Sequence, residues 1–301
     1  MAAVCGADLQ TWRSAVIELD GVPELVDPVM ILAFEGWNDA GDAASDALCH
    51  LAEVWDARPI GELDPEEFYD FQVNRPHAVI GEDGVRSITW PATRVSIARV
   101  PGAGRDAVLV HGVEPSMRWR SFCNELLVLA ADLGVELVVT LGALLADTPH
   151  TRPIPVTGTV TDAALAASLG LETSLYEGPT GIVGVLQAAC SRIGLPAVSV
   201  WAAIPHYVAT PPSPKASLAL LRRIEDLLDV TVPLGDLPED ARAWERGVDE
   251  LAADDVEIGE YVQNLEQARD TADLPEASGD AIAEEFERYL RRRTDEGPTR
   301  S

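Results

Sequence analysis

Short apolar runs alternate with stretches of helical periodicity through the first two thirds of the chain. The apolar runs, rich in Val, Leu, Ile and Ala, occupy residues 28–34, 106–111, 135–141 and 197–204. Such runs are typical of strands buried on both faces. Apolar side chains recur three and four positions apart in residues 40–55, 119–133 and 181–193. This alternation predicts an α/β fold with a mainly parallel sheet that helices cover on both faces.

Three segments depart from this simple alternation. Residues 57–100 favour β-hairpins, with a turn at residues 81–84, and residues 157–160 are typical of a further strand. Residues 205–214 contain four prolines, which predict an extended connector. We therefore expect two parts: an α/β sheet domain over residues 1–210 and a helical extension over residues 211–301.

The helical extension is strongly acidic. From residue 236 onward it has 20 acidic and eight basic residues. Its helical stripes of apolar residues include a last one at Ile282, Phe286, Tyr289 and Leu290. Helices of this kind dock on the sheet domain and solvate its outer face, whereas an exposed apolar stripe would indicate a partner surface.

The charge balance restricts the kinds of partner. The chain has 50 acidic and 22 basic residues and a net charge of −28. Because nucleic acids and anionic membranes are bound through clustered Lys and Arg, neither is expected as a partner. The longest apolar stretch, residues 137–146, is also too short to span a membrane. The acidity favours solubility or the steering of basic proteins.

The cysteines indicate the compartment. They are far apart and form no Cys-x-x-Cys pair, so neither a disulfide framework nor a zinc site is predicted. The N-terminus has no basic start followed by an apolar run, which a secretory signal requires. We therefore expect a cytoplasmic protein that uses no metal and no cofactor.

Polar residues gather just after the predicted strands, where pockets form in open parallel sheets. The candidates for one ligand cleft are Asn38, Asp39, His111, Glu114, His150, Arg152, Glu177 and His206. An alternative interpretation explains the same residues by turn chemistry and by hydrogen bonds to the backbone. Both interpretations remain open from the sequence.

No specific chemistry follows from these candidates. Gly36 and Gly41 have the spacing of a phosphate loop, but the lysine that such a loop needs is missing. Glu114, Asp147 or Glu177 paired with His111 or His150 would suit acid–base work, although no catalytic residue is assigned. Arg152 fits either an anion contact or a structural salt bridge. We expect Asn38 or Asp39 to cap the helix that begins near residue 40.

Several of these loops resemble one known family. Residues 35–43, the block 111–115 with Trp119 and Phe122, and residues 141–153, 176–181 and 199–216 are similar to the bacterial, actinobacterial-type branch of the proteasome assembly chaperone 2 family. The resemblance implies an α/β fold akin to nucleoside phosphorylases and peptidyl-tRNA hydrolases, with a helical C-terminal extension. It also implies protein partners, proteasome subunits among them. Assembly chaperones commonly end in a hydrophobic–tyrosine–any-residue tail, whereas residues 297–301 lack that pattern, so we expect docking by another route.

Two classes of function follow. The first is a non-catalytic protein-binding or assembly factor that works as a homo-oligomer, with a trimer preferred. The alternative is a small-molecule enzyme, a hydrolase or transferase acting on a nucleoside-like or amino-acid-derived compound, or a ligand sensor. A deep pocket lined by Asn38, Glu114, His150 and Arg152 would favour the alternative. A filled cleft together with exposed apolar surface would favour the assembly factor.

Overall fold

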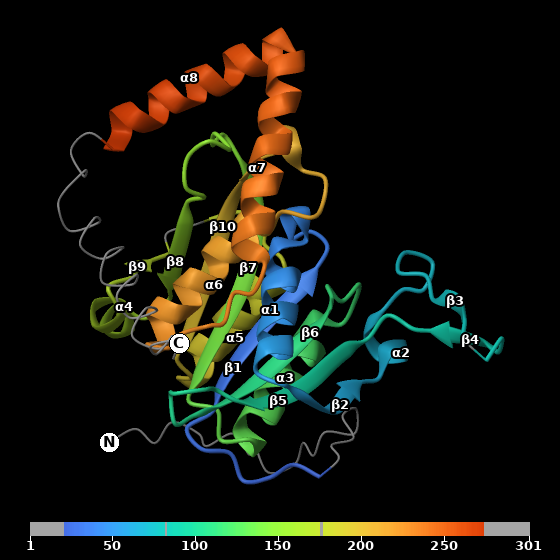
Figure 1. Ribbon diagram of the computed structural model, residues 1–301. Helices are drawn as coiled ribbons and strands as arrows, with labels where there is room; N and C mark the ends of the chain where they lie inside the picture. Colours follow the sequence, from blue (N-terminus) through green and yellow to red (C-terminus); the bar gives the residue numbers. More distant parts are fainter. Residues whose placement is uncertain (1–20, 82, 175–176, 274–301) are drawn as a thin grey trace, which may run out of the picture.

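Strands and helices alternate along the chain (Figure 1), and the computed structural model describes residues 21–81, 83–174 and 177–273. The strands are β1 (Val29–Glu35), β2 (Arg58–Leu63), β3 (His77–Ile80), β4 (Arg86–Thr89), β5 (Thr93–Arg99), β6 (Asp106–Val113), β7 (Leu137–Ala146), β8 (Val156–Val160), β9 (Glu172–Thr173) and β10 (Ala197–Pro205). The helices are α1 (Ala43–Val54), α2 (Pro65–Phe68), α3 (Trp119–Asp132), α4 (Ala163–Leu169), α5 (Ile182–Ile193), α6 (Pro214–Leu228), α7 (Leu237–Asp254) and α8 (Val256–Asp273), with 3-10 turns η2 (Ala40–Asp42) and η3 (His206–Val208).

Eight strands form one sheet in the order β2-β5-β6-β1-β7-β10-β8-β9. The central strands β6, β1, β7 and β10 are parallel, which confirms the predicted mainly parallel sheet. Nearer the edges, β2, β5 and β8 each run antiparallel to the strand on their inner side. β1 pairs with β7 only as far as Leu141, whereas β7 and β10 continue together to Ala146 and Pro205. These two longer strands therefore carry their loops beyond the end of β1.

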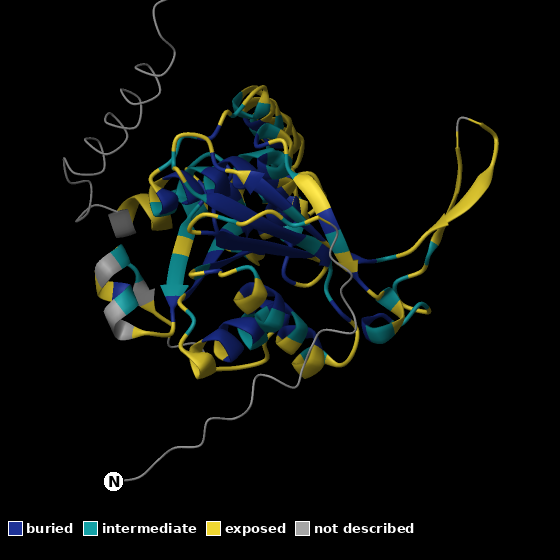
Figure 2. Cartoon of the chain, turned by 90° about the horizontal axis from the view of Figure 1, so that it is seen from below, coloured by how far each residue is buried: buried dark blue, intermediate teal, exposed yellow. Residues whose placement is uncertain are grey.

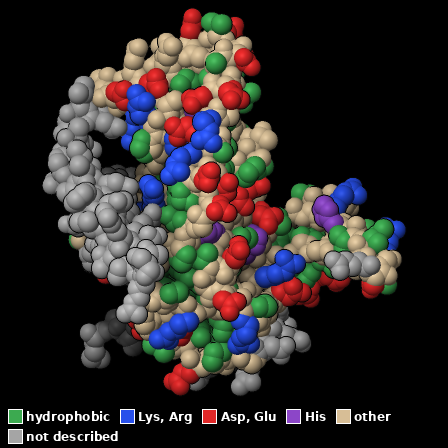
Figure 3. All heavy atoms as spheres, viewed as in Figure 1, with side chains coloured by type: hydrophobic (Ala, Val, Ile, Leu, Met, Phe, Trp, Pro, Cys, Tyr) green, Lys and Arg blue, Asp and Glu red, His purple; other side chains and the backbone are tan. Residues whose placement is uncertain are grey.

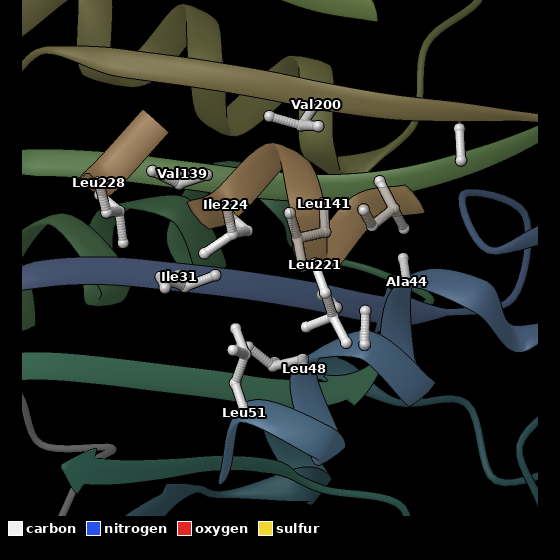
Figure 4. Packing of buried hydrophobic residues seen from close by; sticks show 14 of the residues in the cluster. Ile31, Ala44, Leu48, Leu51, Val139, Leu141, Val200, Leu221, Ile224 and Leu228 are labelled. Carbon is white, nitrogen blue, oxygen red and sulfur yellow. The ribbon is translucent and has the colours of Figure 1, made fainter. Parts of the chain in front are cut away.

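Successive side chains of β1 point to opposite faces of the sheet, and helices bury them on both faces. Ile31 and Ala33 belong to a core shared with α1 and α6, and Leu32 and Phe34 belong to a second core shared with α3 and α5. Figure 4 shows side chains of α1 and α6 meeting those of β1, β7 and β10 in the first core. Burial on both faces explains why these strands are apolar without interruption.

The described part of the expected extension, residues 211–273, has one helix in the core of the sheet domain and two helices outside it. α6 lies beside α1, and its side chains Leu221 and Ile224 are part of the first core. α7 packs on α6 with Val248 buried, and α8 follows it (Figure 1). The expected last stripe, at residues 282–290, lies outside the described residues. Within the described ranges, none of the helices combines the length and the apolar character that crossing a membrane requires.

A separate hairpin, β3–β4, projects from the body (Figures 1 and 2). It pairs His77 with Thr89 and Ile80 with Arg86, so the turn lies where the sequence predicts it. All residues of both strands are exposed, and Figure 2 shows the arm as an exposed protrusion. At its base the rings of Phe71 and Trp90 lie 4.8 Å apart. The hairpin therefore buries little surface of its own.

Candidate functional site

Hydrogen bonds divide the polar loops into two groups, and the first is centred on Asn38 and Glu114. Asn38 is almost fully buried, and its Nδ2 donates to Glu114 Oε1 at 2.7 Å. The same oxygen accepts a hydrogen bond from the backbone N–H of Ile182, the first residue of α5, at 2.8 Å. A Cβ atom at Gly181 would lie 2.2 Å from Asn38 Oδ1. These contacts join the loops after β1 and β6 to the beginning of α5 and leave no space between them.

Of the two residues expected to cap a helix, Asp39 does so, for α1, which begins at Ala43 after the 3-10 turn, whereas Asn38 bonds to Glu114. Its carboxylate accepts hydrogen bonds from the backbone N–H of Ala44 at 2.6 Å and of Ser45 at 3.2 Å, and from the Ser45 hydroxyl. These groups belong to the first turn of α1. Burial raises the pKa of Asp39 to about 6, although the three hydrogen bonds oppose that rise. Gly41, with φ of 60°, makes the close turn, and its carbonyl accepts a hydrogen bond from the Ser213 N–H.

His111 faces Glu35 at the end of β1. Its Nε2 lies 3.3 Å from Glu35 Oε1, and both side chains are partly exposed. Hydrogen bonding and charge from His111 hold the pKa of Glu35 below its usual value, against the opposing effect of burial. The carboxylate of Glu114 is bonded instead to Asn38 and α5. Glu35 was not among the candidates, although it is the acid that the structure pairs with His111.

The second group surrounds His150, which is 1% exposed. The hydroxyl of Tyr207 lies 2.8 Å from both the backbone N–H and Nδ1 of His150, and Asp249 Oδ1 lies 3.1 Å from Nε2. The Asp249 carboxylate can only accept, so Nε2 donates to it, while the Tyr207 hydroxyl accepts from the backbone N–H and also contacts Nδ1. Lys215, the only lysine, donates to the His150 carbonyl and to Glu245. The His150 ring therefore connects the turn η3, which follows β10, to α7.

Arg152 binds α8. Its Nε and Nη2 donate to the two carboxylate oxygens of Asp270 at 2.9 and 2.8 Å, and its Nη1 donates to Glu266 at 3.2 Å. Thr151 also donates to Glu266. A fork of this kind gives a guanidinium a defined orientation. Of the two interpretations of Arg152, the structure displays the salt bridge.

His206 and Glu177 complete the candidate set. His206 Nδ1 lies 3.4 Å from Asp147 Oδ1, and the same oxygen accepts a hydrogen bond from the Tyr261 hydroxyl of α8 at 2.9 Å. The ring of His206 also packs edge-on against Tyr207 and Tyr261. Glu177 is exposed in the loop that precedes α5.

The candidates therefore do not converge on one cleft: Asn38 and Glu114 form one group, His150, Arg152 and His206 lie near α7 and α8, His111 faces Glu35, and Glu177 is exposed. Sequence reasoning missed Asp249, Glu266 and Asp270, the acids of α7 and α8 that bind His150 and Arg152. No local signal marks them, because they are three among many acids on amphipathic helices. In the described part of the chain, no cluster of three or more His, Cys, Asp or Glu is arranged to hold a metal ion.

These loops lie within a family match. The model of the PAC2 family matches residues 33–252. The chain belongs to the PAC2 family. This confirms the resemblance that the signature loops indicate in the sequence. No curated protein matches the chain.

Solved structures extend the comparison. A PAC2 family protein from Streptomyces avermitilis is 64% identical over 78% of this chain and 100% of its own, with a TM-score of 0.75. A Mycobacterium tuberculosis proteasome-assembly chaperone homologue is 60% identical over 78% of this chain and 99% of its own, with a TM-score of 0.72. An archaeal proteasome activator from Pyrococcus furiosus is 18% identical over 78% of this chain and 97% of its own, with a TM-score of 0.62, and shares the fold alone.

Proposed function

We propose that this PAC2 family member is a non-catalytic, cytoplasmic assembly factor that binds other proteins, with proteasome subunits as the first partners to test. The Mycobacterium tuberculosis relative is a proteasome-assembly chaperone homologue, which supports this choice. The candidate cleft residues Asn38 and His150 are bonded to neighbouring elements, which favours a structural role over turnover of a substrate.

The observation that carries the proposal is the projecting hairpin. Ile80 and Val85, on either side of its turn, are 76% and 60% exposed, and Val79, Ile88 and Trp90 are also exposed. Apolar side chains on an arm whose two strands are exposed along their length favour burial against another protein. A two-stranded hairpin also offers unpaired strand edges to a partner.

The partner of the hairpin in this proposal is a second copy of the chain. Two copies that each carry a net charge of −28 repel one another, so they meet most easily where charge is low. Residues 70–91, which include the hairpin, hold three acidic and two basic residues and are close to neutral. We therefore place self-association at the hairpin and keep a trimer as the preferred homo-oligomer.

The acidic helices α7 and α8 supply a different surface. Residues 236–273 contain 13 acidic and three basic residues, and most of their side chains are exposed. A surface of this kind attracts a basic patch on a client and raises the association rate. Salt screens exposed charges over about 8 Å at physiological ionic strength, so such binding weakens as salt is added.

The test is a pull-down of purified proteasome α subunits at about 50 and about 200 mM salt, concentrations that differ in screening. The triple variant Glu239→Gln, Asp240→Asn and Glu250→Gln removes three exposed acids of α7. A variant with the same charge change elsewhere is Glu53→Gln, Asp132→Asn and Glu136→Gln, whose acids are also exposed.

We expect capture at low salt by the wild type and by the control variant, and weaker capture by the α7 variant and at the higher salt. Equal capture by both variants would refute the role of α7. An absence of capture by the wild type at both salt concentrations would refute the choice of α subunits as partner.

A further inference from the structure

A cavity of about 670 Å³ lies between α6, α7 and the segment that leads into β8. Its lining concentrates positive charge on a chain whose net charge is −28. The basic lining residues are Arg152, Lys215, Arg222, Arg223 and Arg242. Among the residues that the structure describes, two acids line it with them, Asp226 and Glu245. Figure 3 shows Lys and Arg side chains gathered beside α7, below α8.

Arg223 is one of the basic residues that line this cavity. Its Nε is buried, and no hydrogen-bond acceptor for it lies among the described residues. A Cβ atom at Gly158 of β8 would lie 3.3 Å from Arg223 Nη2, so the missing side chain of Gly158 leaves room for the guanidinium against the strand. A buried N–H without an acceptor is costly, and an anionic ligand would supply the acceptor.

Two other cations are already held in place. Lys215 Nζ binds Glu245 Oε2 at 2.6 Å, and Arg152 binds Asp270 and Glu266. Their positions are therefore fixed before any ligand arrives, which reduces the entropy lost on binding. Arg242, exposed on α7, adds a further cation at the rim.

The remaining wall is apolar. Ile154 and Leu218 are nearly buried, and Val156, Ala219 and Ala241 continue the same surface. Pockets of about 300–1,000 Å³ with apolar walls and a few fixed polar groups are typical of small-molecule sites. The combination of an apolar wall with clustered guanidinium groups suits a molecule that has an organic body and a strongly anionic group.

We propose that this cavity binds a small organic anion whose phosphate or clustered carboxylate groups contact Arg223 and Arg242. The ligand would bridge α6 and α7 and hold the acidic helix against the sheet domain. Its binding would therefore stabilise the folded protein. The inference does not depend on the proposed assembly function, and it places ligand recognition away from Asn38 and Glu114.

Binding can be measured by calorimetry and by thermal melting of the full-length protein with three probes: ATP without Mg²⁺, citrate and inorganic phosphate. ATP represents organic phosphates, and citrate represents polycarboxylates. The variants are Arg223→Gln and Arg242→Gln, and the matched control is Arg246→Gln, which removes the same charge one turn further along α7, outside the cavity lining. If Arg223→Gln does not fold, the exposed Arg242→Gln still tests the site.

We expect ATP or citrate to raise the melting temperature and to bind about tenfold or more weakly to each cavity variant, the loss that one charge-assisted hydrogen bond represents. The probe that binds identifies the phosphate or the carboxylate source, and Arg246→Gln should retain wild-type affinity. The proposal is overturned if neither ATP nor citrate binds, or if inorganic phosphate binds as tightly as the organic anion that does bind. It is also overturned if Arg246→Gln weakens binding as much as Arg242→Gln.

Discussion

The carboxylate of Asp39 is buried and also caps α1. Burial raises its pKa, and the hydrogen bonds of the cap lower it. The pKa rises from 3.8 to about 6, because the hydrogen bonds from Ser45 and Ala44 only partly oppose the effect of burial. Because the folded-state pKa lies above the unfolded value, the folded protein holds this proton more tightly. The resulting stabilisation is fully present below the unfolded pKa and is lost as the pH rises through about 6.

The size of this effect follows from the shift. A difference of about two pKa units corresponds to about 3 kcal/mol in the free energy of unfolding. About 1.3 kcal/mol of it falls between about pH 5 and pH 7, where the folded form titrates. This window also stays above the sequence pI of 4.3, near which the protein would carry little net charge. Asp39→Asn removes the titrating group, so the wild type should lose that stability relative to the variant as the pH rises.

The assay is urea unfolding of the wild type and Asp39→Asn at intervals across that window. Glu239→Gln, at an exposed site on α7, controls for the change in net charge. Ser45→Ala removes the hydrogen bond that most lowers the Asp39 pKa, so its loss of stability should extend to higher pH. Stability curves of the wild type and Asp39→Asn that run parallel, or that diverge in the opposite direction, would refute the reasoning.

Two further predictions concern the hairpin and the glycines. The double variant Ile80→Asp, Ile88→Asp should have a lower molecular mass than the wild type in light scattering at micromolar concentration. Ile193→Asp, at an exposed site on α5, should keep the wild-type mass. A monomer mass for the wild type would contradict self-association. Gly181→Ala should destabilise the fold by about 1–3 kcal/mol, because its Cβ would meet Asn38 and Glu114. At Gly247 on α7 an added Cβ would meet no described atom within 4 Å beyond the helix's own backbone, so Gly247→Ala should instead stabilise the fold by up to about 1 kcal/mol in urea unfolding. Equal effects of the two substitutions would contradict the packing argument.

Local patterns predicted most of the secondary structure because each element buries a characteristic face. The stretch expected to be helical at residues 119–133 is the helix Trp119–Asp132, and the strand expected at residues 157–160 is Val156–Val160. The turn at residues 81–84 joins β3 to β4 as expected. The sequence did not reveal that β8 runs antiparallel to β10, because strand direction depends on the path of the connecting loops rather than on the strand's own residues.

The candidate site was less predictable, since its contacts join elements far apart in the sequence. His150 and Asp249 are 99 residues apart, and Arg152 and Asp270 are 118 apart. The pattern of acids along α7 and α8 distinguishes neither Asp249 nor Asp270 from the acids that face solvent. Only the docked helices show which carboxylates are paired with basic side chains.

The acidic residues of this protein therefore have two roles: some cap helices, and others form an exposed negative surface. Asp39 and Glu114, from the family's signature loops, accept backbone N–H groups at the beginnings of α1 and α5, where the helix dipole favours negative charge. Asp39 is buried and Glu114 is partly buried, and each carboxylate is bound to a helix of its own chain. Most acids of α7 and α8 are exposed, and their helices are held to the body by Arg152 and His150. A client that recognises negative charge would meet these helices first, and an anion in the cavity between α6 and α7 would determine how firmly that surface is held.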